Sequence, residues 1–206
     1  MLADGLTMMY GLDRPAEPAT TRYGDAQLDR VFAELAGASF GGGLYRVHVP
    51  EAAEEWTARA EEAFPELVDR MFVFGCDWLG RQFAADAQRA KNRHPLVLLL
   101  DPATGDALEI PVTIADLHTD ELVQYGDSAL ALEFYADWRE ASGDDDFLGP
   151  EDCVGYDVPL FLGGDDEVSN LSRIHMGAYW EVTTELRLGD LKLPPGGTIW
   201  DLFEDG

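Results

Sequence analysis

The chain has 206 residues, of which 46% are hydrophobic, and this apolar fraction excludes an intrinsically disordered acidic protein. Forty acidic residues against fourteen basic ones give a net charge of −26, which excludes a surface built to bind nucleic acid. No apolar run approaches the roughly 18 residues of a membrane helix, and residues 1–15 lack the pattern of a secretory leader. We therefore expect a folded, cytoplasmic protein without a membrane partner.

The first two dozen residues, with Pro15 and Pro18, predict an irregular lead-in. Apolar residues at helical spacing then predict a helix over about residues 25–36. Alternation predicts a strand over residues 44–49. Pro50, followed by acidic residues, opens a helix that ends at Pro65.

Short apolar runs separated by turn residues predict a sheet from residue 70 onward. The expected strands cover residues 71–75, 81–85, 96–101 and 107–112. The turn sequence from Asp101 to Asp106 joins the last two as a hairpin, so the sheet should be largely antiparallel. The expected fold is α/β of the α+β kind, with helices packed on that sheet. Residues 70–206 would form the main domain, and residues 1–69 a helical and strand segment within it or before it.

Residues 127–141 show the clearest helical periodicity, with Gly143 just past the end. Residues 178–188 fit both a helix and an alternating strand, and we favour the helix. After the turn sequence at residues 194–197, the apolar tail around Trp200 and Phe203 must either dock on the fold or be exposed.

Metal and cofactor chemistry finds little support in the sequence. The two cysteines, Cys76 and Cys153, lie far apart and are typical of buried thiols in a reducing compartment. No two of the four histidines have the i, i+4 spacing of a helical zinc site. The acidic runs that start at Asp144 and Asp165 do not match a calcium-binding loop. We expect no metal and no cofactor.

Ser39 lies in Gly37-Ala-Ser-Phe-Gly41, which matches the pattern of a nucleophile elbow. That motif requires a strand before the serine and a helix after it, and the predicted order here is reversed. The glycines are better explained as a helix stop and a flexible turn. Catalysis at Ser39 remains only as the alternative of a hydrolase with an unknown substrate.

The segment from Asp152 to Leu171 places an apolar run beside paired glycines and three consecutive acids. Its charge is wrong for a phosphate cradle. Pro159 restricts the chain, residues 160–162 can anchor it in the core, and Gly163-Gly164 permits positive backbone angles, at Gly164 in particular. We expect a fixed loop that displays Asp165, Asp166 and Glu167.

The charge is unevenly distributed along the chain. Ten of the fourteen basic residues precede residue 94, whereas residues 94–172 hold nineteen acids and only one base, Arg139. Such an excess is either a solvated surface or a surface that attracts a basic partner. The acids with the better claim to partner contact are Asp144, Asp145, Asp146, Asp165, Asp166 and Glu167.

Several motifs, in this order, resemble the C-terminal domain of type VI secretion immunity proteins, which protect bacteria from a DNase effector. That domain is often found after a GAD-like domain and is similar to the SUKH-type immunity group. The resemblance covers about residues 70–188. Its motifs are Gly75-Cys-Asp-Trp-Leu-Gly-Arg-Gln-Phe83, Asp101-Pro-Ala-Thr-Gly105, Cys153-Val-Gly-Tyr-Asp-Val-Pro-Leu-Phe-Leu-Gly-Gly164, Asn170-Leu171 and Tyr179-Trp180.

The resemblance implies an α/β fold, no catalysis, and inhibition of a cognate toxin by binding. The partner would be a basic nuclease, which the acidic residues above would contact. We expect large aromatic motif residues to serve packing, and Arg81 to lie against an acid such as Asp77. The residues expected to form the scaffold are Gly75, Asp77, Trp78, Gly80, Arg81, Cys153, Gly155, Pro159, Gly163, Gly164, Asn170, Tyr179 and Trp180. A general acidic DNA mimic or adaptor is a further alternative.

Overall fold

The computed structural model describes residues 1–17, 19–143, 146–189 and 198–202. These residues form a seven-stranded sheet in the order β1-β2-β3-β4-β5-β6-β7 and a separate two-stranded sheet of β8 and β9. Every neighbouring pair of strands is antiparallel, so the α/β fold with a largely antiparallel sheet is as predicted. The strands are β1 Leu12–Arg14, β2 Ser39–Phe40, β3 Tyr45–Val47, β4 Met71–Asp77, β5 Gln82–Lys91, β6 His94–Asp101, β7 Asp106–Thr113, β8 Asp152–Tyr156 and β9 Leu171–His175.

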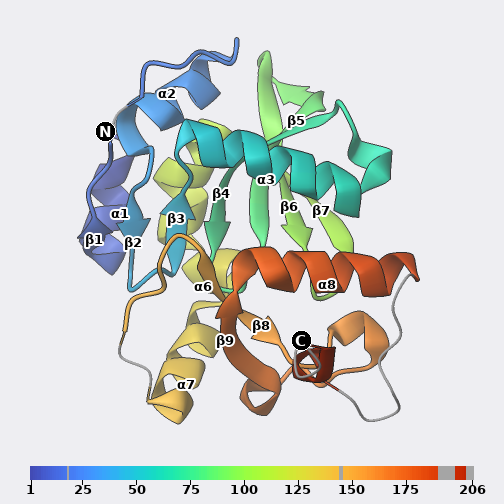
Figure 1. Ribbon diagram of the computed structural model, residues 1–206. Coiled ribbons are helices and arrows are strands. Elements are labelled where there is room, and N and C mark those ends of the chain that lie inside the picture. The colour runs from blue at the N-terminus through green and yellow to red at the C-terminus, as the bar shows by residue number, and fades with distance from the viewer. Residues whose placement is uncertain (18, 144–145, 190–197, 203–206) are drawn as a thin grey trace.

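Helices cover both faces of the large sheet, with α3 and α8 on the near face and α6 behind it (Figure 1). No described helix is long and apolar enough to cross a membrane. The α-helices are α1 Ala3–Tyr10, α2 Ala26–Leu35, α3 Pro50–Ala63, α4 Ile114–Asp116, α5 Leu122–Gln124, α6 Gly126–Leu130, α7 Leu132–Ser142 and α8 Met176–Leu188. The short helical turns are η1 Pro65–Leu67, η2 Leu117–Glu121, which is a π-helix, η3 Leu160–Leu162, η4 Val168–Asn170 and η5 Ile199–Leu202.

Strand β6, which lies next to the edge strand β7, shows why the sheet needs helices on both sides. Its Val97 and Leu99 belong to the hydrophobic cluster on one face, whereas Leu98 and Leu100 belong to the cluster on the other. Successive side chains of a strand point to opposite faces, so a continuous apolar run must be buried on both. The run at residues 96–100 therefore specifies a strand in a three-layer arrangement.

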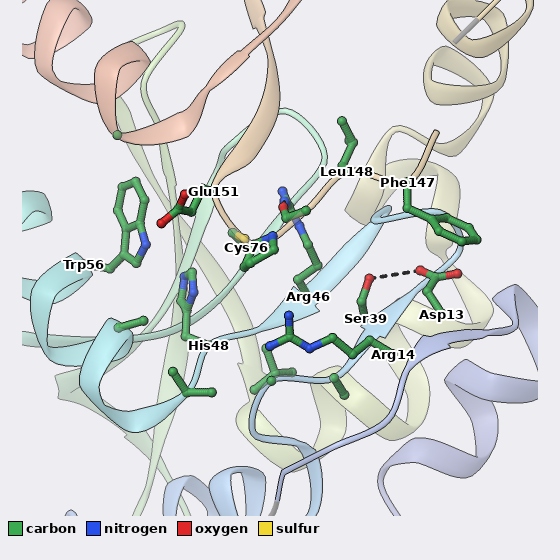
Figure 2. Close-up of a pocket in the computed structure, with 18 of the residues that line it drawn as sticks. Asp13, Arg14, Ser39, Arg46, His48, Trp56, Cys76, Phe147, Leu148 and Glu151 are labelled. Carbon is green, nitrogen blue, oxygen red and sulfur yellow. Dashed lines mark hydrogen bonds between the residues drawn. The ribbon is translucent and has the colours of Figure 1, made fainter. Parts of the chain in front are cut away.

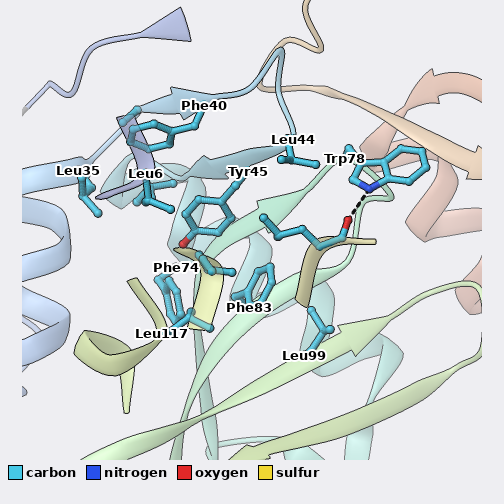
Figure 3. Packing of buried hydrophobic residues seen from close by; sticks show 14 of the residues in the cluster. Leu6, Leu35, Phe40, Leu44, Tyr45, Phe74, Trp78, Phe83, Leu99 and Leu117 are labelled. Carbon is cyan, nitrogen blue, oxygen red and sulfur yellow. Dashed lines mark hydrogen bonds between the residues drawn. The ribbon is translucent and has the colours of Figure 1, made fainter. Parts of the chain in front are cut away.

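The larger cluster is centred on aromatic side chains from β3, β4 and β5 (Figure 3). Tyr45, Phe74 and Phe83 are all at most 1% exposed. The Tyr45 hydroxyl reaches across this core to Nε2 of His118, at 2.9 Å, and Nδ1 of His118 donates to the Ile114 carbonyl at 2.7 Å. Both ring nitrogens of the buried histidine thus have partners.

Most elements predicted from periodicity are present. Asp25 caps α2, where its carboxylate accepts from the backbone N–H groups of Gln27 and Leu28, and Pro50 begins α3. Asp101 pairs with Asp106 at the end of the predicted hairpin. Residues 176–188 are helical, as we favoured. At these positions the capping and turn residues were sufficient to predict where the helices begin and where the hairpin turns.

The prediction of an irregular lead-in is wrong. Residues 3–10 form α1, whose Leu6 is buried together with the preceding Leu2, and β1 pairs with β2 at the edge of the large sheet. Two apolar residues four apart place one face of a short helix on the core, which the neighbouring prolines obscured in the sequence. Residues 1–69 therefore supply β1, β2 and β3 to the same sheet as the rest of the chain.

The single helix predicted over residues 127–141 is also wrong, because the chain breaks at Ala131. This residue adopts a left-handed conformation, with φ 51°, between α6 and α7. The break frees the Leu130 carbonyl from the helical ladder, and the buried indole N–H of Trp78 donates to it at 2.8 Å. A tertiary hydrogen bond thus takes the place of a helical one.

The apolar tail docks on the fold at its described residues. Ile199 is 1% exposed, and its N–H donates to the Asp157 carbonyl at 2.7 Å. The Trp200 indole donates to the Asp157 carboxylate. Phe203 and the turn sequence at residues 194–197 lie outside the described residues.

Candidate functional site

The motif at the end of β4 forms a tight, buried turn into β5. The Asp77 carboxylate is fully buried and accepts from the backbone N–H groups of Leu79 and Arg81, at 3.0 and 3.1 Å. It also forms an ion pair with the Arg81 guanidinium at 2.6 Å, as expected. Burial raises the pKa of Asp77, and the Arg81 charge opposes that rise. The turn is held by a satisfied internal network.

The tryptophans of the motifs are fully buried and each satisfies its N–H group internally. Trp180, on α8, donates to the Gly80 carbonyl at 2.8 Å, just as Trp78 donates to the α6–α7 break. The neighbouring Tyr179 is also fully buried, and its hydroxyl accepts from the backbone N–H of Tyr156 at 3.3 Å. These contacts tie β4, α6, β8 and α8 together, which makes packing the role of these side chains.

Small motif residues sit where a larger side chain would not fit. A Cβ atom at Gly75 would lie 2.7 Å from the Arg46 carbonyl, and one at Gly155 would lie 2.8 Å from the Tyr179 ring. Gly80 has φ +75° and packs on Cys153, which is fully buried and free, as is Cys76. The ordered motifs therefore meet in one buried junction between the large sheet, β8 and α8.

Asn170 fixes the loop that precedes the acidic run. Its side-chain oxygen accepts from the Val158 N–H, and its amide nitrogen donates to the carbonyls of Val158 and Asp165, all at 2.9 Å. The backbone N–H of Gly164 donates to the Pro159 carbonyl at 3.2 Å. The loop is thus held from both ends by backbone-directed hydrogen bonds.

The prediction of a positive backbone angle at Gly164 is wrong, since Gly163 has it instead, with φ 87°. Gly164 is required for a different reason. A Cβ atom there would lie 1.9 Å from the Val158 carbonyl oxygen. The expected apolar anchor is also weaker than predicted, because Leu162 is 45% exposed while residues 160 and 161 are half-buried.

The acids of this loop differ in their surroundings. Asp165 and Glu167 are exposed, whereas the exposed Asp166 also accepts a 2.5 Å hydrogen bond from the Tyr156 hydroxyl. Asp146 is exposed at the end of the segment after α7, where its carbonyl accepts from Arg139, and Asp144 and Asp145 lie outside the described residues. Figure 1 shows the end of α7 and the orange η3 turn on opposite sides of β8 and β9, so Asp146 and the acids of the η3–η4 loop do not converge on one point.

A cavity of about 520 Å³ lies between the β1–β3 side of the large sheet, helix α3 and the segments that precede β8 and α8 (Figure 2). Its walls come from β1 to β4, from the α3 residues between Ala52 and Arg59, from the segment before β8 and from the start of α8. Charged groups line it despite its depth, in particular Arg14, Arg46 and Arg59. Sequence reasoning singled out none of these arginines, and no spacing links residues 14, 46 and 59.

His48 and Ser39 also line this cavity. Burial lowers the pKa of His48 to about 4, so the ring is neutral at pH 7, and its Nε2 hydrogen-bonds the Gln82 side chain at 2.8 Å. The Ser39 hydroxyl donates to the Asp13 carboxylate at 2.9 Å. The serine lies in a short strand, β2, rather than in a strand-to-helix turn. A nucleophile elbow is therefore not the geometry at this residue.

Comparisons with known proteins support the fold and nothing narrower. No family model matches the chain, and no curated protein does. The crystal structure of Atu4351 from Agrobacterium tumefaciens is similar, with a TM-score of 0.52 and 12% identity over 89% of this chain and 88% of that one. The chain therefore belongs to the α+β fold class. Its two distinguishing features are the acidic loop and the separate cavity.

Proposed function

We propose that this chain is an immunity-type inhibitor that binds and neutralises a basic nuclease toxin through its acidic surface. The observation that carries the proposal is the η3–η4 loop, which holds exposed carboxylates in a fixed geometry in the acidic half of the chain. A preformed anionic loop loses little conformational entropy when it binds a cationic surface. The ordered sequence motifs that resemble DNase-immunity proteins support the same function.

The charge predicts the kinetics of such a complex. A net charge of −26 should steer a basic partner and raise the association rate above the roughly 10⁵ to 10⁶ M⁻¹s⁻¹ of unsteered protein pairs. Salt should lower this rate several-fold between about 50 and 200 mM, because the Debye length shortens. The dissociation rate should change less.

The test variant reverses two loop charges, Asp165→Lys with Glu167→Lys. Asp166 is left intact, because its carboxylate accepts the Tyr156 hydroxyl and its removal would disturb the loop itself. The matched control is Glu62→Lys with Glu66→Lys, two exposed acids near the end of α3. Each double variant makes the net charge four units less negative, so the pair separates local contact from overall charge.

The neighbouring genes are first searched for a nuclease toxin, and its absence would count against the proposal. Each variant is then co-expressed with that toxin in bacteria, and survival is scored with circular dichroism as the folding control. We expect the loop variant to lose protection and to associate at least tenfold more slowly, whereas the control protects. Equal protection by both variants would contradict contact through this loop. Inhibition of unrelated basic nucleases to the same extent would instead favour a general DNA mimic.

A further inference from the structure

We propose that the cavity beneath α3 binds a small organic oxyanion, a carboxylate or phosphate ester with an apolar body. This site is separate from the acidic loop and goes beyond the proposed inhibition of a toxin. Its lining combines one buried arginine, Arg46, and two half-buried ones with apolar side chains, and its volume of about 520 Å³ lies within the range of small-molecule sites.

Arg46 is the first reason. It is 4% exposed and lines the cavity, and its terminal nitrogens donate to backbone carbonyls of Gly149, Asp152 and Asp77. Its Nε has no hydrogen-bond partner among the described residues. No described carboxylate lies within ion-pair distance of this guanidinium. The nearby Asp152 carboxylate, whose pKa Arg46 helps to lower, is paired with Arg173 at 2.8 Å. A buried cation whose own hydrogen bonds go only to neutral oxygens favours a further anion beside it.

Arg14 is the second reason. It is half-buried on β1, and Figure 2 shows its guanidinium between His48 and Ser39, with Arg46 above it in this view. None of the ion pairs within the described residues involves Arg14. A chain with a net charge of −26 has many carboxylates that could pair with an arginine. Two arginines that line one cavity without an ion pair among the described residues therefore favour a shared anionic ligand.

Within the described residues, the acids that line the cavity form no ion pair with its arginines. Asp13 already accepts from the Ser39 hydroxyl and from two backbone N–H groups, at 2.9 to 3.0 Å. Glu55 and Glu151 are exposed, and Glu151 lies 3.8 Å from the His175 ring. They therefore belong to the rim, while the arginines reach the interior.

The start of α3 adds backbone donors to the same cavity. Val49 occupies the N-cap position without a side-chain cap, and both it and Ala52 line the cavity. The first-turn N–H groups of a helix lack intrahelical partners, and the positive end of the helix dipole favours an anion there. Apolar contacts for the body of the ligand come from Pro15, Trp56 and Leu148.

Calorimetric titration tests the proposal with benzoate and phenyl phosphate as probes. Benzamide, which has the same ring without the charge, is the matched ligand, and inorganic phosphate tests the head group alone. We expect both oxyanions to bind at least tenfold more tightly than benzamide, and phenyl phosphate to bind more tightly than inorganic phosphate. The preference between the two oxyanions distinguishes a carboxylate from a phosphate ligand.

The variant Arg14→Gln should weaken binding of the preferred oxyanion about ten- to a hundredfold, the effect typical of a lost charged hydrogen bond. Arg22→Gln, an arginine with a 75% exposed side chain outside the cavity, should stay within twofold of the unmodified protein. Ala52→Phe should narrow the cavity beside the start of α3 and weaken binding of the oxyanion at least tenfold. Absence of oxyanion binding, equal binding of benzamide, or an unchanged affinity in folded Arg14→Gln would overturn the proposal.

Discussion

Acidification from pH 7.5 to 5.0 should destabilise this protein through the buried histidine His118. The side chain is 0% exposed and lies in the aromatic core between Tyr45 and Phe74. Its Nδ1 donates to a backbone carbonyl, so its Nε2 carries no proton and accepts from the Tyr45 hydroxyl. A second proton, on Nε2, would put a positive charge in the core. It would also place an N–H donor opposite the O–H donor of Tyr45.

The magnitude follows from the shift of the pKa. Burial lowers the pKa of His118 from 6.5 to about 4. Between these values the unfolded chain binds more protons than the folded one, so stability is complete above pH 6.5 and is lost as the pH falls toward 4. Linkage gives a loss of about 2 kcal/mol at pH 5.0 and about 3 kcal/mol for the whole window. His48, whose pKa is also lowered to about 4 by burial, adds a loss of the same sign.

The assay is urea denaturation at pH 7.5 and 5.0, with the free energy of unfolding compared between variants. His118→Gln cannot titrate, so its stability should fall by about 2 kcal/mol less over this interval than that of the unmodified protein. His175→Gln is the control, because the His175 side chain is 60% exposed. Protonation of the many carboxylates affects all three proteins alike and cancels in the comparison.

The reasoning is refuted if His118→Gln and the unmodified protein lose the same stability between the two pH values. A ring titration by NMR that places the pKa of His118 near 6.5 in the folded state would refute it directly. A smaller loss in His175→Gln than in His118→Gln would show that a surface histidine controls the acid response.

Four further substitutions test the packing and the chemistry. Gly164→Ala should lower the free energy of unfolding by roughly 3 kcal/mol or more, because its Cβ would lie 1.9 Å from the Val158 carbonyl oxygen. Gly163→Ala should lower it by only about 1 kcal/mol, through backbone strain. Equal losses in urea denaturation would contradict this difference. Trp78→Phe should cost about 1 to 3 kcal/mol by leaving a buried carbonyl without its donor, and an unchanged denaturation midpoint would count against that hydrogen bond. Ser39→Ala should leave any hydrolysis of p-nitrophenyl acetate unchanged, since Ser39 lies in the short strand β2 and not in a strand-to-helix turn; loss of activity would support the hydrolase alternative.

Local signals in the sequence determined much of the fold. The Asp25 cap, Pro50 and the turn at residues 101–106 each act within a few residues of the chain, so their consequences could be read without tertiary information. The apolar run at residues 96–100 specified a strand covered on both faces. The expected burial of Trp78 and Trp180 and the pairing of Arg81 with Asp77 are confirmed as well.

The remaining features depend on residues that are distant in the chain. The break at Ala131 exists because an indole 52 residues away from Leu130 takes its carbonyl, and periodicity alone continues the helix through this point. The requirement for glycine at position 164 comes from the Val158 carbonyl, which folds back above it. In each case a long-range contact outweighed a local preference.

The sequence by itself determined an acidic, mixed α/β protein with a fixed loop, because composition, capping and periodicity act locally or on the chain as a whole. Only the tertiary structure decided that Arg14 on β1, Arg46 on β3 and Arg59 on α3 line one cavity. Arg14 and Arg46 are 32 positions apart in the sequence, and Arg46 and Arg59 are 13 positions apart. Strand pairing and helix packing bring them to one cavity. A cavity formed by three separate elements leaves no spacing pattern, since each element has its own period and the contacts between elements set the distances.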